Sequence, residues 1–262
     1  EALAHFERAW DLDPLRPGPP FWITSTLTGL RRYAELIGPK KLFQQRFPSL
    51  TYEYIDIARI ECRVQHSLEP LRRALREHGG ALSAEDRNKA ETVLARVEGR
   101  YQDAAKRLLT WKLDPLDRNL RLGFLYWAAG DTAASQRMFR AVEREAQSQL
   151  RHEHDEVDAL EQLALAQSML GEHAAALAAI DAVRAAYPEA REPVNGPPVS
   201  FIRSIILVRG GRKAEGYAEV QRLLRVPYGA PSDLFDDGTG EMLLLVKDDP
   251  QYTEIVNHPP RL

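Results

Sequence analysis

Residues 121–139 read RLGFLYWAAGDTAASQRMF and predict one helix, a tight turn and a second helix. Leu122, Gly123 and Tyr126 fall on one face of the first helix, because residues three and four apart are neighbours on a helical surface. Gly130 follows Tyr126 by four residues and marks the turn, and Phe139 comes nine residues after that glycine. The stretch therefore predicts a hairpin of two helices.

The same offsets recur one unit further along the chain. Gly171 takes the turn position, Leu163 and Ala164 precede it, and Ala176 and Ile180 follow it by five and nine residues. Most of the other residues differ between the two copies. Self-similarity at a fixed period indicates an array of helical hairpins.

This pattern of small and large apolar residues resembles the tetratricopeptide repeat, whose unit is about 34 residues long. The turn glycines Gly99, Gly130, Gly171 and Gly211 are separated by 31, 41 and 40 residues. We expect the extra length to fall between repeats. The resemblance implies an all-α fold, a right-handed superhelical solenoid of antiparallel helix pairs.

The pattern predicts three segments along the chain. Residues 1–14 have the spacing of the second helix of a truncated repeat, so we expect further repeats upstream. Residues 15–230 form the helix-pair array, in which Phe21 to Ile37 is expected to be one helix that ends at Gly38-Pro39. Residues 231–262 form a C-terminal capping segment.

The capping segment contains a short apolar run, Met242 to Val246, followed by Asp248-Asp249-Pro250. It looks like the closing segment found after such repeats in multidomain bacterial signalling proteins. The resemblance implies that this chain is the sensing or docking module of a larger bacterial signalling or regulatory protein.

Composition excludes several classes of function. The chain has 262 residues, of which 44% are hydrophobic, and its single cysteine, Cys62, allows no internal disulfide. No apolar run approaches the roughly 18 residues that span a bilayer, so no membrane insertion by this segment is expected. The sequence does not fix the cellular compartment. The cytoplasm is slightly favoured, and an upstream membrane-spanning segment would instead imply the periplasm.

Charge is distributed unevenly. Residues 1–130 hold 21 Lys and Arg against 17 Asp and Glu, and residues 131–262 hold 14 against 21. A solvated helical surface tolerates such a pattern, and a groove that selects differently charged parts of a partner would also produce it. Because no basic face with interleaved aromatic residues is present, nucleic acid is not expected as a partner.

No motif predicts catalysis or a cofactor. His152 and His154 are two residues apart and would point away from each other on a helix, so a metal site there is not expected. The acidic turn at 236–241 lacks the frame of a calcium loop. The sequence also has no phosphate-binding glycine loop and no nucleophile elbow. We therefore predict no enzyme activity, no cofactor and no metal.

In the family that the chain resembles, the first helices of successive repeats line a concave groove. Matching by position gives eight candidate partner-binding residues: Lys89, Arg96, Leu120, Phe124, Trp127, Glu161, Leu165 and Met169. Phe124 and Trp127 would be the aromatic anchors. The alternative is that residues 140–150 or the terminal segment cover both aromatics, which would make them core residues. Arg96, Arg118 and Arg121 would either clamp a peptide carboxylate or lie in solvent.

The expected function is binding of a protein or peptide, with affinity that weakens as salt concentration rises. Two alternatives stay open. The concave surface would hold a small ligand or lipid, or the chain would be a regulatory region attached to an upstream kinase, cyclase or DNA-binding domain. Self-association is a further possibility, because an uncapped end exposes an apolar edge.

Overall fold

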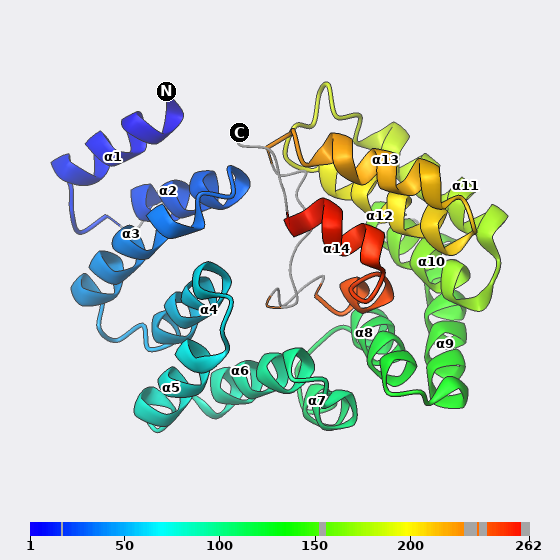
Figure 1. Ribbon diagram of the computed structural model, residues 1–262, viewed down its shortest axis with the longest axis horizontal. Coiled ribbons are helices and arrows are strands. Elements are labelled where there is room, and N and C mark those ends of the chain that lie inside the picture. Colours follow the sequence, from blue (N-terminus) through cyan, green and yellow to red (C-terminus); the bar gives the residue numbers. More distant parts are fainter. Residues whose placement is uncertain (17, 152–155, 228–234, 236–239, 258–262) are drawn as a thin grey trace. The chain divides into compact units, whose positions relative to one another are not determined.

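The computed structural model describes residues 1–16, 18–151, 156–227, 235 and 240–257, and within these residues the chain contains helices and no β-strand (Figure 1). None of the described helices combines the length and the hydrophobicity needed to cross a bilayer. The described residues form fourteen α-helices and one 3-10 helix: α1 (Ala2–Leu12), α2 (Gly18–Gly29), α3 (Tyr33–Arg46), α4 (Glu53–Gln65), α5 (Glu69–His78), α6 (Ala84–Val97), α7 (Tyr101–Leu108), α8 (Pro115–Ala128), α9 (Thr132–Leu150), α10 (Glu156–Leu170), α11 (His173–Ala186), α12 (Gly196–Arg209), α13 (Lys213–Leu223), η1 (Met242–Leu245) and α14 (Pro250–Asn257).

The helices pack mainly against their neighbours in sequence. Helix α8 packs on α9, α10 packs on both α9 and α11, and α12 packs on α11 and α13. The first helices of these hairpins also touch, since α10 contacts both α8 and α12. This order of contacts is consistent with a helical repeat.

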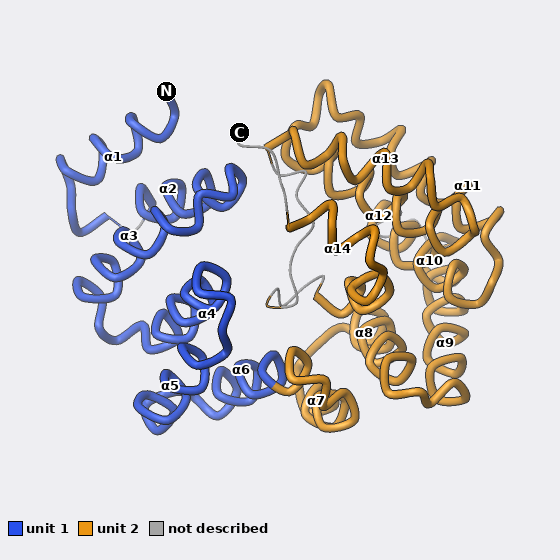
Figure 2. The backbone as a smooth tube through the Cα atoms, viewed as in Figure 1, with its two compact units in different colours: residues 1–94 blue, residues 95–262 orange. Residues whose placement is uncertain are grey.

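The chain divides into two compact units, residues 1–94 and 95–262, with the boundary inside α6 (Figure 2). Unit 1 has a small core in which Trp10, Ile23, Leu27, Leu36 and Ile60 are buried together. Unit 2 has a larger core that runs from α8 to α14, and a second cluster that surrounds Trp111. Each unit thus buries apolar side chains of its own.

The turns predicted from the glycine spacing are confirmed. Gly99, Gly130, Gly171 and Gly211 follow α6, α8, α10 and α12, and their φ angles are 76°, 79°, 87° and 82°. Left-handed backbone of this kind disfavours any residue with a Cβ, which is why glycine ends the helices here. At the first of the two hairpins that define the repeat, Asp131 then caps α9 by accepting a hydrogen bond of 2.9 Å from the Ala134 amide.

The prediction of one helix from Phe21 to Ile37 is wrong. Two helices occupy this region, because Arg31 adopts a left-handed conformation with φ of 55° between α2 and α3. Pro39 does not end α3, which continues through it to Arg46. Continuation lets Leu36 and Phe43 both pack against the core of unit 1, and this burial offsets the backbone hydrogen bond that proline cannot make.

The apolar run at 242–246 closes the core of unit 2. Met242 and Leu243 join the cluster that contains Phe124, while Leu244 joins the cluster around Trp111. Helix α14 then packs on α13. Residues 231–234, 236–239 and 258–262 of the expected capping segment lie outside the described residues, as do His152 and His154.

Candidate binding site

Most of the candidate residues in unit 2 are not on an open surface. The exposed fractions are 7% for Leu120, 2% for Phe124 and 5% for Leu165. Their expected exposure in a groove is therefore corrected: these side chains belong to the core. They are buried because the terminal segment packs over them, which is one of the alternatives that the sequence leaves open. Met242 of that segment belongs to the same apolar cluster.

The remaining apolar candidates lie at the edge of this core. Met169 is partly buried and packs against the cluster. Trp127 is 36% exposed, and the guanidinium carbon of Arg209 lies 5.7 Å from its ring centroid. Trp127 is thus the predicted aromatic anchor that reaches solvent, whereas Phe124 does not.

Two of the three charged candidates, Lys89 and Arg96, are already paired within the chain. Lys89 lies in unit 1 and forms an ion pair of 2.8 Å with Glu85, one helical turn earlier. Arg96 is 1% exposed, and its Nη1 donates to Glu241 Oε1. Arg121 Nη2 donates to the same oxygen at 3.1 Å. Two of the arginines considered as a carboxylate clamp therefore hold a carboxylate of the chain itself.

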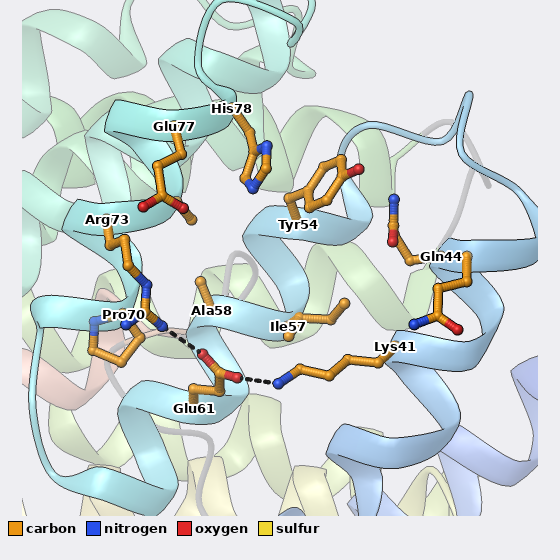
Figure 3. A pocket seen from close by; sticks show the side chains of 12 residues that line it. Lys41, Gln44, Tyr54, Ile57, Ala58, Glu61, Pro70, Arg73, Glu77 and His78 are labelled. Atoms are coloured by element: carbon orange, nitrogen blue, oxygen red, sulfur yellow. Dashed lines mark hydrogen bonds and ion pairs between the residues drawn. The ribbon is translucent and has the colours of Figure 1, made fainter.

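Unit 1 contains a pocket of about 310 Å³ between α3, α4 and α5 (Figure 3). We call it the α3–α5 pocket. Its apolar floor is buried and consists of Ile57, Ala58, Pro70 and Ala74. Its polar lining is provided by Lys41, Gln44, Gln45, Tyr54, Glu61, Arg73, Glu77 and His78. The lining is thus more polar than that of a typical small-molecule pocket, which is mostly apolar with a small number of polar groups.

One end of the α3–α5 pocket carries two cations that share one carboxylate. Figure 3 shows Glu61 between Lys41 and Arg73, with Lys41 Nζ 2.7 Å from Oε1 and Arg73 Nη2 3.3 Å from Oε2. The Glu61 side chain is 11% exposed, whereas those of Lys41 and Arg73 are 52% and 50% exposed. Each cation thus keeps donors that face solvent at the mouth of the pocket.

The opposite wall is made by two stacked rings. Tyr54 of α4 and His78 of α5 lie with their ring centroids 3.8 Å apart and their planes 14° from parallel. Figure 3 places both side chains across the pocket from Lys41, Glu61 and Arg73.

No protein-family model and no curated protein matches this chain. Within the described residues, no group of three or more His, Cys, Asp or Glu side chains is arranged to hold a metal ion.

Sequence reasoning missed the α3–α5 pocket. The charged residues of its ion cluster, Lys41, Glu61 and Arg73, are separated by 20 and 12 positions, and no repeat offset relates them. Only packing of α3 on α4 and of α4 on α5 brings these side chains together.

Proposed function

We propose that the chain is a protein-binding scaffold of the tetratricopeptide type, a right-handed solenoid that serves as a docking or sensing module in a larger bacterial signalling or regulatory protein. Support comes from the hairpin order of contacts and from the left-handed glycine that follows the first helix of each of four successive hairpins. The proposed activity is recognition without catalysis.

The α3–α5 pocket carries this proposal. A volume of about 310 Å³ lies at the lower end of the range for ligand sites and suits one or two side chains of a peptide. Burying one apolar side chain on the floor of Ile57, Ala58 and Ala74 would contribute about 1.5–3 kcal/mol. The proposed partner is a peptide segment in which an apolar residue stands beside Asp or Glu.

The proposed preference for an acidic residue rests on the two half-exposed cations, Lys41 and Arg73; the lining also contains the acids Glu61 and Glu77. Lys41 and Arg73 are half exposed, and their remaining donors can reach a second carboxylate while Glu61 stays bound to them. Arginine suits this role because its planar group donates two parallel hydrogen bonds to a carboxylate. Gln44 and Gln45 add donors and acceptors that match a peptide backbone.

Selection from a displayed random-peptide library against the full chain tests the proposal. We expect enriched peptides to pair an apolar residue with Asp or Glu. Arg73→Gln should weaken the best peptide about tenfold, since a charge-assisted hydrogen bond contributes roughly 1.5–3 kcal/mol. The measurement is fluorescence anisotropy with the labelled peptide.

Arg76→Gln is the matched control for that experiment. Arg76 is on the same helix, its side chain is 62% exposed, and it pairs with Glu69 at 2.6 Å outside the pocket. We expect this variant to bind within about twofold of the unaltered chain, as exposed ion pairs contribute little. Failure to enrich any shared motif, or equal losses in both variants, would count against the pocket.

Salt dependence gives a second test of the same site. Because Lys41 and Arg73 are half exposed, their attraction to an acidic peptide should be screened as the Debye length falls from about 10 Å at 0.1 M to about 3 Å at 1 M. We expect the affinity to decrease several-fold over that range. An affinity that does not change would remove these cations from the recognition.

A further inference from the structure

A second, smaller pocket lies inside unit 2. It has a volume of about 100 Å³ and is enclosed by α8, α10, α12 and the residues that lead into η1; we call it the α8–α12 cavity. Most of its wall is apolar and is formed by Leu120, Phe124, Leu165, Ile202 and Met242. A short aliphatic chain would find favourable surroundings there.

One carboxyl group of this cavity is left without a counter-ion. Glu161 of α10 is half-buried, and the described residues offer its side chain no hydrogen bond and no ion pair. The nearest charge that acts on it is another acid, Asp158, three residues earlier on the same helix. Burial and this repulsion raise the pKa of Glu161 to about 7.

Two further acceptors near the cavity also lack partners. Among the described residues, neither Gln162 Oε1 nor Glu241 Oε2 has a hydrogen bond, although both atoms are buried. Glu241 is 1% exposed, and both residues line the cavity. Buried acceptors without donors are rare, because each costs free energy when it loses water. The surplus of acceptors over donors points to a ligand that donates.

The cation already present does not fill this role. Arg121 Nη2 is bound to Glu241 Oε1 at 3.1 Å, and its guanidinium carbon lies 4.7 Å from the Trp111 ring centroid. Its Nε is buried and unpaired within the described residues, and no ion pair joins Arg121 to Glu161 there. Asp117, whose pKa burial raises, lies 3.9 Å from Arg121 Nη1.

We propose that the α8–α12 cavity binds a primary alkylammonium group with a chain of three or four carbons, and that the Glu161 carboxylate is its counter-ion. A cavity of about 150 Å³ accommodates benzene, so a cavity of about 100 Å³ matches a shorter aliphatic ligand. The same chemistry occurs in a free amine and in a lysine side chain. This site is separate from the α3–α5 pocket, so failure of either proposal leaves the other standing.

The expected pH dependence of alkylammonium binding follows from the titratable and charged groups that face the cavity. Charged groups reach it from α8, which provides Asp117 and Arg121, and from the segment that carries Glu241, while α12 contributes only the apolar Ile202 to its lining. An alkylammonium stays protonated between pH 6 and pH 8, but Glu161 changes from mainly neutral to mainly ionised. The affinity should therefore rise about tenfold across that range.

Isothermal titration of the full chain with n-butylammonium chloride tests this. We expect binding at pH 8, about tenfold weaker binding at pH 6, and much weaker binding of n-butanol, which has the same size and no charge. Glu161→Gln should abolish binding of the ammonium while far-ultraviolet circular dichroism stays unchanged. Asp158→Asn is the matched control, because Asp158 is on the same helix and outside the lining, and it should retain binding at pH 8, where Glu161 is already mainly ionised.

A tripeptide Gly-Lys-Gly separates the two sources of the ligand. Binding as tight as that of butylammonium assigns the cavity to a lysine side chain, and weaker binding assigns it to a free amine. A carboxyl resonance of Glu161 that titrates at lower pH in the presence of butylammonium would confirm the contact independently. The proposal is overturned if no heat is released at pH 8, if butanol binds equally well, or if Glu161→Gln binds like the unaltered chain.

Discussion

Replacement of Glu241 by alanine is expected to lower the free energy of unfolding of unit 2 by about 3–5 kcal/mol. The carboxylate of Glu241 is 1% exposed and accepts hydrogen bonds from both Arg96 and Arg121. Those two arginines are themselves 1% and 5% exposed. Without the carboxylate, two buried positive charges would face each other with little solvent to screen them.

The measurement is urea unfolding of the full chain, with amide hydrogen exchange to report on α8 and α10. Glu241→Gln keeps a hydrogen-bond acceptor but removes the charge. It should therefore lower the free energy of unfolding less than Glu241→Ala does. The triple variant Arg96→Met, Arg121→Met, Glu241→Met removes all three charges together and should lose less stability than Glu241→Ala does, because the two buried arginine charges are removed with their shared carboxylate. A loss below about 1 kcal/mol for Glu241→Ala would show that the arginines find other partners.

This buried ion cluster fixes where the end of the chain lies in unit 2. Arg96 and Glu241 are 145 positions apart in sequence, so their contact closes a long loop. Apolar contacts alone would tolerate a shift of the terminal segment by a few residues. A carboxylate that two buried arginines share can be placed correctly in only one register of that segment. We infer that the cluster selects the register in which Met242 and Leu243 enter the large cluster and Leu244 enters the other.

The parts of the fold that depend on local chemistry could be predicted from the sequence. The turn after α8 needs a left-handed residue, and Gly130 marks it in any context, with φ of 79°. The same reasoning failed at Gly38-Pro39, because a core contact of Leu36 and Phe43 outweighs the local cost of proline in α3. Local rules hold where no tertiary contact opposes them.

The candidate sites depend on contacts that sequence periodicity does not contain. Periodicity gives the face of a helix on which Phe124 lies, but not what covers that face. The cover is Met242, which the sequence shows only as part of an apolar run more than 100 positions away. The acceptor surplus around Glu161 likewise arises only when α8, α10 and the terminal segment are brought together.

Phe124→Ala and Trp127→Ala are expected to differ sharply although the two residues are one helical turn apart on α8. Phe124 is 2% exposed and packs edge to face on Phe139, with ring centroids 5.3 Å apart. Its truncation should lower the free energy of unfolding by about 3–5 kcal/mol, as for other large buried aromatics. Trp127 is 36% exposed and is not a member of either buried cluster of unit 2, so its truncation, which also removes the contact with Arg209, should cost less, about 1–2 kcal/mol.

Thermal and urea unfolding of both single variants measure this difference, and the Phe124 variant should also lose hydrogen-exchange protection in α8 and α9, the helices that the two phenylalanines join. Equal and small losses would mean that Phe124 faces solvent after all and that the terminal segment does not cover it. A large loss confined to Phe124→Ala would instead make Trp127 the position on α8 at which partner contacts can be tested without unfolding the protein. Any binding defect of Trp127→Ala would then report on recognition rather than on stability.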